Sequence, residues 1–265
     1  MGEFFRCLED NGRSISSRLR SRAALLSFTR WASDEYGEPI RNPFRDVVIP
    51  AQALLAPREL SPDQRYILKH LVERTRDPRA EAIFALGYWA GCRVSDVSWL
   101  GLADTRVGPR TGSLTVGHKG GKTRTIDLAN EARQPLFAYL DVPRAAKGRR
   151  ASAGEEFAFT SQRGGRLTES GIHQWFQSLR ARATEDEWPL VADVSFHDLR
   201  HDWAHRARTA GWKLEEVAYY LGHVTRQGLP AIRTTARYTQ ASREQVRLKL
   251  PLVRALSTKL GWLGQ

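Results

Sequence analysis

The apolar residues of this chain follow a helical period through most of its length, and the pattern changes to alternation between Leu114 and Leu128. Alternating residues there flank the sequence HKGGK at residues 118–122. Two adjacent glycines between such segments are typical of the tight turn of a β-hairpin, because glycine adopts positive φ without steric cost. The sequence therefore predicts an α+β fold that is mostly α-helical and contains a small antiparallel β-hairpin or sheet.

Stretches with the helical period predict the other elements. We expect helices at residues 16–36, 61–76, 80–90, 94–102, 131–140, 168–183, 197–210, 214–221 and 242–256. Four prolines exclude a long helix from residues 37–57 and indicate a connection between two domains. We therefore expect a short helical segment at residues 1–50, a linker at 51–60 and a larger domain at 61–265.

The net charge narrows the class of partner. The 265 residues include 41 lysines and arginines against 29 aspartates and glutamates, which gives a formal net charge of +12. With 41% hydrophobic and 26% charged residues, the composition is that of a folded globular protein and excludes a disordered chain. A basic surface of this kind is typical of proteins that bind polyanions, so we expect nucleic acid ahead of an anionic membrane.

Three sequence features indicate the cellular compartment of the protein. The N-terminus lacks a basic-then-apolar signal pattern. The longest apolar stretch, residues 82–92, is about half of the ~20 residues that a membrane-spanning helix needs. Cys7 and Cys92 are the only cysteines, and we interpret them as free thiols. These features predict a cytoplasmic protein without membrane contact.

A run of ionisable residues in the expected helix 197–210 is the first candidate for chemistry. His197 and Arg200 share a helix face at i and i+3, which places a proton-transfer group beside a guanidinium that can clamp a phosphate. His201 and His205 continue the run and leave open a zinc site. The pattern differs from the zinc signature H-E-x-x-H because Asp198 replaces the glutamate, and no third ligand follows at a fixed spacing.

Two further candidates lie at the ends of expected elements. Lys119 and Lys122 are at the tip of the hairpin, where an ammonium can reach into a phosphate-lined groove, although a solvated turn explains either lysine taken alone. His223 follows Gly222 at the end of the expected helix 214–221. The dipole of that helix favours a cation at this position.

Tyr238 is the candidate nucleophile. Arg233 and Arg237 precede it closely, and a phenol near such charge ionises more easily and attacks phosphorus more readily. Tyr219 and Tyr220 are the competing tyrosines, but both fall inside the expected helix 214–221. We therefore predict that Tyr219 and Tyr220 pack in the core.

The order of these candidates resembles the tyrosine recombinase (phage integrase) family. The catalytic set of that family reads Arg, Lys, His-x-x-Arg, His or Trp, and Tyr. This chain presents in that order Arg93 within GCRVSD, the lysine hairpin, His197-x-x-Arg200, Leu221-Gly222-His223 and Tyr238. The resemblance covers about residues 57–249, and it is specific because five separated motifs match in sequence.

The resemblance implies a role for each matching residue. Arg93 and Arg200 would hold the scissile phosphate and stabilise its pentacoordinate transition state. Lys119 would protonate the departing 5′ oxygen. His197 would assist proton transfer at the tyrosine, and His223 would hydrogen-bond the phosphate.

Tyr238 is the nucleophile that the resemblance implies. Its attack would give a 3′-phosphotyrosyl bond that conserves the energy of the phosphodiester, so neither a metal nor another cofactor is implied. Asp96 and His201 match family positions and would hold the catalytic side chains in place. Lys122 and Arg124, of the same hairpin, would contact the DNA.

Two departures from the family pattern bear on these roles. Family members carry a helical core-binding domain before the catalytic one, and residues 14–50 resemble only its last part. We therefore expect a truncated core-binding segment at residues 1–50 and the catalytic domain at 61–265. His223 and Tyr238 are 15 residues apart, a longer loop than the family pattern. Extra loop residues add little conformational free energy, and they leave open whether Tyr238 serves its own or a neighbouring active site.

The implied function is site-specific recombination, in which a homotetramer on two sites cuts and rejoins double-stranded DNA at the nucleoid. Three alternatives remain. A non-catalytic relic would bind DNA without cutting it. A zinc hydrolase built on His197 and His201 would leave Arg93, Lys119 and Tyr238 without a role. A type IB topoisomerase shares the chemistry, but the compact length of this chain and its arrangement from Leu-Gly-His to the tyrosine resemble a recombinase more.

Overall fold

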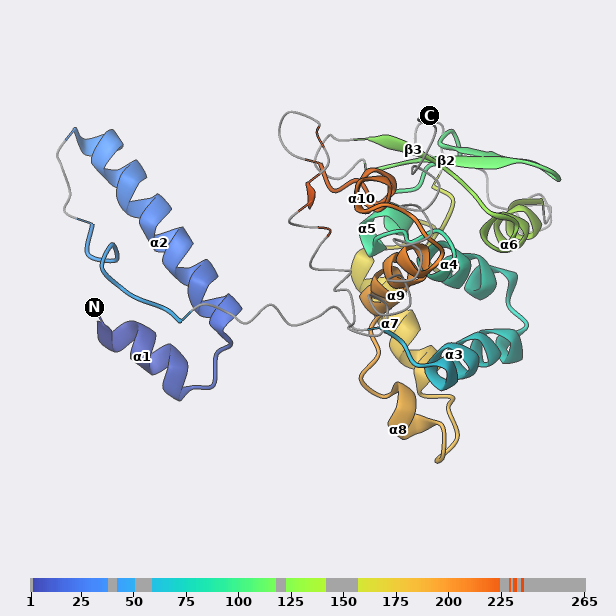
Figure 1. Ribbon diagram of the computed structural model, residues 1–265, viewed down its shortest axis with the longest axis horizontal. Helices are drawn as coiled ribbons and strands as arrows, with labels where there is room; N and C mark the ends of the chain where they lie inside the picture. The colour runs from blue at the N-terminus through green and yellow to red at the C-terminus, as the bar shows by residue number, and fades with distance from the viewer. Residues whose placement is uncertain are drawn as a thin grey trace, which may run out of the picture. The chain divides into compact units, whose positions relative to one another are not determined.

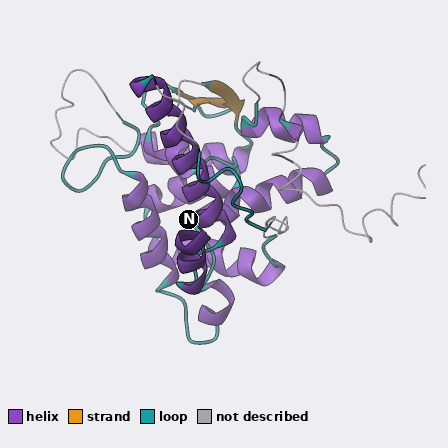
Figure 2. Cartoon of the chain, turned by 90° about the vertical axis from the view of Figure 1, so that its left-hand side faces the viewer, coloured by secondary structure: helices purple, strands orange, loops and turns teal. Residues whose placement is uncertain are grey.

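The computed structural model describes residues 2–37, 42–50, 59–117, 123–141 and 157–224, together with residues 229, 231, 232 and 235. The chain divides into two compact units, Met1–Leu55 and Ala56–Gln265 (Figure 1). Helices dominate the described residues, and the strands form one small sheet (Figure 2). The fold class predicted from the sequence is confirmed.

The first unit is built on two helices, α1 (Gly2–Asp10) and α2 (Ile15–Tyr36). The Ser14 side chain caps α2 by accepting a hydrogen bond from the Ser17 N–H. Gly37 ends α2 in the left-handed conformation, which glycine adopts without strain. The helix predicted at 16–36 is confirmed, and α1 was not predicted.

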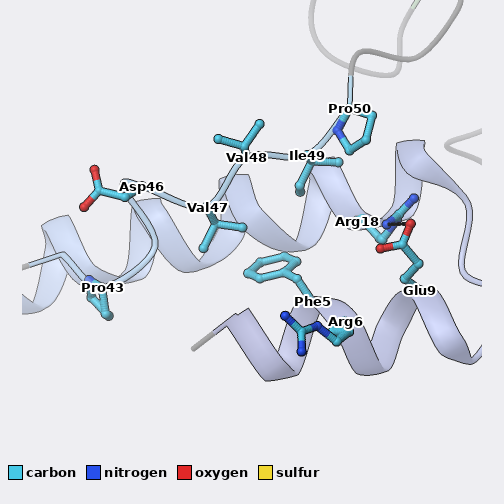
Figure 3. Close-up of a pocket in the computed structure, with 10 residues that line it drawn as sticks. All are labelled: Phe5, Arg6, Glu9, Arg18, Pro43, Asp46, Val47, Val48, Ile49 and Pro50. Atoms are coloured by element: carbon cyan, nitrogen blue, oxygen red, sulfur yellow. Dashed lines mark ion pairs between the residues drawn. The ribbon is translucent and has the colours of Figure 1, made fainter.

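Residues 42–50 pack on these two helices. The Phe44 ring lies 6.3 Å from the buried Phe5 ring of α1, and Arg22 of α2 donates to the carbonyl oxygens of Phe44 and Arg45 at 3.3 and 2.9 Å. Together with α1 and α2 the segment borders an open pocket of about 400 Å³, beside the Arg18–Glu9 ion pair (Figure 3). Residues 42–50 are thus free of helix, as predicted, and they belong to the first unit.

The second unit contains the helices that position the site. They are α3 (Pro62–Thr75), α4 (Pro78–Tyr88), α5 (Val94–Ser98), α6 (Asn130–Asp141), α7 (Glu169–Arg180), α8 (Trp188–Val191), α9 (Phe196–Thr209) and α10 (Leu214–Leu221). A capping box between Ser61 and Gln64 starts α3 where the sequence predicted it. The helix predicted at 94–102 is wrong in length, because the Leu100 carbonyl accepts the Ala158 N–H and Gly101 forms a β-bridge with Phe157. The predicted helix 242–256 lies outside the described residues.

The described strands form an antiparallel sheet in the order β1-β2-β3, from β1 (Thr105–Val107), β2 (Gly112–Val116) and β3 (Arg124–Asp127). Leu114 of β2 is opposite Ile126 of β3, which confirms the two strands of the predicted hairpin. Both side chains are buried. The hairpin tip at 118–122 lies outside the described residues. The short strand β1 was not predicted.

Helix α4 is the centre of the core and sets the position of α9. Its residues from Ala82 to Tyr88 are all buried, which is why its sequence is apolar on every face. It packs against α6 and α9 (Figure 1). A Cβ at Gly87 would meet the Phe196 ring of α9 at 2.7 Å, so glycine permits the close approach. The N-terminal half of α9, with its histidines and Arg200, is thereby fixed against the core.

Asp202 of α9 fastens the start of the second unit to this core. Its carboxylate is fully buried and accepts hydrogen bonds from the Leu60 N–H at 3.2 Å, from Arg65 at 2.7 and 2.9 Å and from Arg206 at 2.9 Å. Removing one member of a buried charged network leaves its partners without compensation. Asp202 therefore holds α3 and α9 together.

Asp202→Ala is expected to lower the free energy of unfolding by about 3 kcal/mol, because two guanidinium groups and one main-chain N–H lose their acceptor. Urea unfolding followed by circular dichroism measures the change. The control is Glu59→Gln, because Glu59 pairs with the same Arg65 at 3.2 Å but is solvent-exposed. Equal effects of the two substitutions would contradict this role of Asp202.

Candidate active site

Arg200 is at the centre of the site and is fully buried. Its Nη1 donates to the Gly91 carbonyl at 2.6 Å, and its Nη2 donates to the Leu221 carbonyl at 2.6 Å. The same Nη2 lies 3.1 Å from Nε2 of His223. The guanidinium therefore joins the loop after α4, the helix α9 and the C-terminal end of α10. These contacts bring Arg200 and His223 together, two residues to which the family resemblance assigns the same phosphate.

Arg93 is the N-cap residue of α5, two residues after Gly91, whose carbonyl Arg200 binds. Its N–H donates to Oδ2 of the buried Asp96 at 3.0 Å. The same carboxylate oxygen accepts a hydrogen bond from Arg124 of β3 at 3.3 Å. Asp96 thus binds the main chain of Arg93 and the side chain of Arg124.

Arg124 has internal contacts. Besides Asp96, its Nε donates to the Tyr220 carbonyl of α10 at 2.9 Å, and its side chain is largely covered. A Cβ at Gly222 would meet Arg124 Cδ at 2.8 Å, so the C-terminal glycine of α10 allows this approach. The DNA contact predicted for Arg124 stays a prediction. Its observed contacts join β3, α5 and α10.

His197 and His201 lie one turn apart on α9, with their rings edge to face at 4.4 Å. Burial lowers the pKa of His197, and the Arg200 charge lowers it further. Burial and the neighbouring His197 lower the pKa of His201 to about 4. Both imidazoles are therefore neutral at pH 7, so His197 has a lone pair that can accept a proton.

His223 is buried beside three arginines. Burial is the first cause that lowers its pKa to about 3, and the charges of Arg200, Arg93 and Arg124 add to it. His223 is therefore neutral at pH 7, although it follows the C-terminal end of α10, where the helix dipole favours a cation. The dipole of α10 is outweighed by desolvation and by like charge.

The two tyrosines that compete with Tyr238, Tyr219 and Tyr220, differ in how far they are buried. Tyr220 stacks on Trp203 at 4.4 Å and donates its hydroxyl hydrogen to the Asp127 carbonyl, and burial raises its pKa. Its predicted core packing is confirmed. Tyr219 is 73% exposed, so the same prediction is wrong for it. The helix α10 buries the face of Val217, Ala218 and Leu221 and turns Tyr219 away.

The remaining predicted residues either lie outside the described residues or have few contacts with the site. Lys119, Lys122 and Tyr238 lie outside the described residues. His205 is buried with Nδ1 at 3.8 Å from Glu59. Within the ranges that the structure covers, no group of three or more His, Cys, Asp or Glu side chains is placed to hold a metal ion. Among the described helices, none has the length and apolar character that crossing a bilayer requires.

Thr235 also belongs to the site, although no sequence pattern indicated it. Its fully buried Oγ1 lies 3.1 Å from Nδ1 of His223. The Ala231 N–H donates to the His223 carbonyl at 2.6 Å, and the Thr235 N–H donates to the Ala231 carbonyl at 3.1 Å. Nothing in the sequence spacing distinguishes Thr235 from Thr234 beside it.

A comparison with protein families decides the class. The model of the phage integrase family matches residues 59–245. The chain belongs to the phage integrase family. The family that the motif order resembled is thereby confirmed, and with it the class of enzyme, a tyrosine-type site-specific recombinase. The relic alternative is not favoured.

Individual members of the family align over most of this chain. Tyrosine recombinase XerC of Oceanobacillus iheyensis is 28% identical over 237 residues, which cover 89% of this chain and 72% of the relative. XerC of Roseiflexus castenholzii is 30% identical over 240 residues with the same coverage. The Tn1549 transposon integrase, solved in complex with circular intermediate DNA, has a TM-score of 0.69 at 18% identity, covering 94% of this chain and 83% of that one. XerA recombinase has a TM-score of 0.58 at 22% identity, covering 94% and 79%.

Proposed function

We propose that this integrase-family chain cuts and rejoins double-stranded DNA with Tyr238 as its nucleophile. The observation that carries the proposal is the contact of Arg200 with Gly91, Leu221 and His223, because it joins three of the five family motifs around one buried guanidinium. A donor held in this way is pre-organised for the charge of a phosphoryl transition state.

Each step assigns one bond or proton to a residue. The Tyr238 hydroxyl loses its proton to neutral His197, and its oxygen attacks the phosphorus. The bond from phosphorus to the 5′ oxygen breaks, and Lys119 gives that oxygen a proton. The charge that develops on the phosphate is stabilised by Arg93 and Arg200. Rejoining reverses these steps on a second 5′ hydroxyl.

The chemistry conserves one phosphodiester-level bond throughout, so the proposed reaction consumes no nucleotide and uses no metal. His223 hydrogen-bonds the phosphate. Asp96 and His201 hold Arg93 and His197 in place. The short contacts of Asp96 with the Arg93 N–H and of His201 with His197 support these positioning roles.

The proposed partner is duplex DNA, bound by a homotetramer on two sites at the nucleoid. The net charge of +12 supports a polyanion. XerH recombinase and the Tn1549 transposon integrase were solved on their DNA substrates, which supports the same class of ligand for this chain. We assign the first unit, with α1 and α2, as the core-binding segment and the second unit as the catalytic domain.

Strand cleavage in the presence of EDTA tests the proposed function. We expect nicking and covalent capture of DNA from the gene's flanking region to persist in EDTA, whereas inhibition reversed by zinc would support the hydrolase alternative.

DNA affinity is expected to fall about a thousandfold between about 50 and 200 mM salt, because bound phosphates release counterions. Lys122→Ala is expected to lower the slope of log affinity against log salt by about one. An affinity independent of salt would contradict the partner.

A further inference from the structure

The His223 ring lies between two polar partners in the interior. Its Nε2 is 3.1 Å from Nη2 of Arg200, and its Nδ1 is 3.1 Å from Oγ1 of Thr235. His223 is 4% exposed and Thr235 is fully buried. Each ring nitrogen therefore has a protein partner whose hydrogen-bonding chemistry is known.

These partners determine where the imidazole carries its hydrogen. A guanidinium has five N–H donors and no acceptor, so Nε2 of His223 must accept from Arg200. A neutral imidazole has one N–H, which must then be on Nδ1 and donate to Oγ1 of Thr235. The Thr235 hydroxyl in turn donates to the Ala231 carbonyl, 3.3 Å away. The hydrogen bonds run in one direction from Arg200 to a main-chain oxygen.

This arrangement conflicts with what a phosphate requires of His223. A phosphate oxygen accepts hydrogen bonds, so an Nε2 lone pair cannot bind it. Doubly protonated His223 is disfavoured, because burial and the charges of Arg200, Arg93 and Arg124 lower its pKa to about 3. The remaining form is the neutral tautomer with the hydrogen on Nε2. In the change, Nδ1 gives its proton to water, Nε2 takes a proton from water, and the Arg200 N–H turns from Nε2 to the phosphate, so the net charge of the ring stays the same.

We propose that Thr235 is the positioning residue of His223 and that its hydroxyl serves both tautomers. In the DNA-free protein, Oγ1 accepts from Nδ1–H and donates to Ala231. When Nε2–H faces the scissile phosphate, the hydroxyl rotates and donates to Nδ1. A hydroxyl can do both because it is at once donor and acceptor. The phosphate-facing half of this inference rests on the proposed function, and the tautomer of the DNA-free protein does not.

Nitrogen NMR of the DNA-free protein tests the tautomer directly. In protein with ¹⁵N-labelled histidine, two-bond proton–nitrogen spectra distinguish a protonated Nδ1 from a protonated Nε2, and His223→Gln assigns the signal by removing it. We expect wild type to show His223 protonated at Nδ1, with a hydrogen-bonded Nδ1 proton that exchanges slowly. Thr235→Val, which keeps the shape and removes the hydroxyl, should lose that slow proton, and Thr235→Ser should restore it. Protonation at Nε2 in wild type, or an unchanged proton in Thr235→Val, would overturn the proposal.

Single-turnover cleavage of nicked DNA tests the second half. We expect Thr235→Val to slow cleavage about tenfold at unchanged DNA affinity, as for the loss of one neutral hydrogen bond to a catalytic group. Thr235→Ser should stay within about twofold of wild type. Equal losses of cleavage rate in both variants would mean that Thr235 only packs, which would refute the proposal. Full activity of Thr235→Val would refute it as well. If wild type itself does not cleave, the proposed function fails, while the NMR result still decides the tautomer.

Discussion

Arg200→Lys is expected to slow DNA strand cleavage by about 10²- to 10³-fold while leaving most of the DNA affinity intact. The guanidinium reaches the Gly91 and Leu221 carbonyls and His223 at once, from a position with no solvent exposure. A lysine ammonium keeps the charge, but its three donors start from one atom and cannot span these partners. The loss should therefore appear in the transition state, where the phosphate needs donors of fixed direction.

Arg200→Ala should add a structural defect. The two main-chain carbonyls would be left in the interior without donors, which costs about 3 kcal/mol in unfolding free energy. Single-turnover rates on nicked DNA, together with fluorescence anisotropy for binding, separate the two effects. The matched control is Arg206→Lys on the same helix, because Arg206 contacts Asp202 and Tyr88 away from the site. Near-normal cleavage by Arg200→Lys would contradict the assignment of Arg200 to the phosphate.

Tyr238→Phe is expected to abolish strand cleavage, because the attacking oxygen is removed and nothing else about the side chain changes. DNA affinity should stay within about twofold of wild type, since one neutral hydroxyl contributes little to binding dominated by phosphate contacts. The chain supplies a sharp control in Tyr219, whose phenol is 73% exposed and therefore available to react. Tyr219→Phe should cleave at the wild-type rate. Loss of cleavage in Tyr219→Phe with retention in Tyr238→Phe would move the nucleophile to α10.

Local patterns were sufficient to predict much of the fold. The capping box at Ser61 starts α3, and the all-apolar sequence of α4 indicated a helix buried on every face. The alternation in residues 114–128 predicted β2 and β3. The predictions that failed concerned short elements whose ends depend on contacts with residues far away in the sequence. Helix α5 stops early because the main chain near Leu100 pairs with the segment at Phe157, and no local signal encodes that partner.

The same division applies to the site. The identities of Arg93, His197, Arg200 and His223 follow from motif order, but the charge of His223 does not, because it depends on arginines from three separate segments. The Asp202 network joins residues 137 and 142 positions apart in the chain. Tyr219 is exposed because α10 turns its other face to the core. In a short helix with two adjacent tyrosines, the sequence does not show which of the two is buried, because packing determines it.

The residue that becomes covalently bound to DNA distinguishes Tyr238 from every other candidate nucleophile. Wild-type protein is mixed with nicked DNA from the gene's flanking region, denatured in SDS, digested with trypsin and analysed by mass spectrometry. Trypsin cuts after Arg237 and Arg243, so Tyr238 falls in a peptide of its own, separate from the one with Tyr219 and Tyr220. We expect a nucleotide on Tyr238, bound through its phenolic oxygen. A nucleotide on any other residue, or cut DNA without a covalent complex, would contradict it.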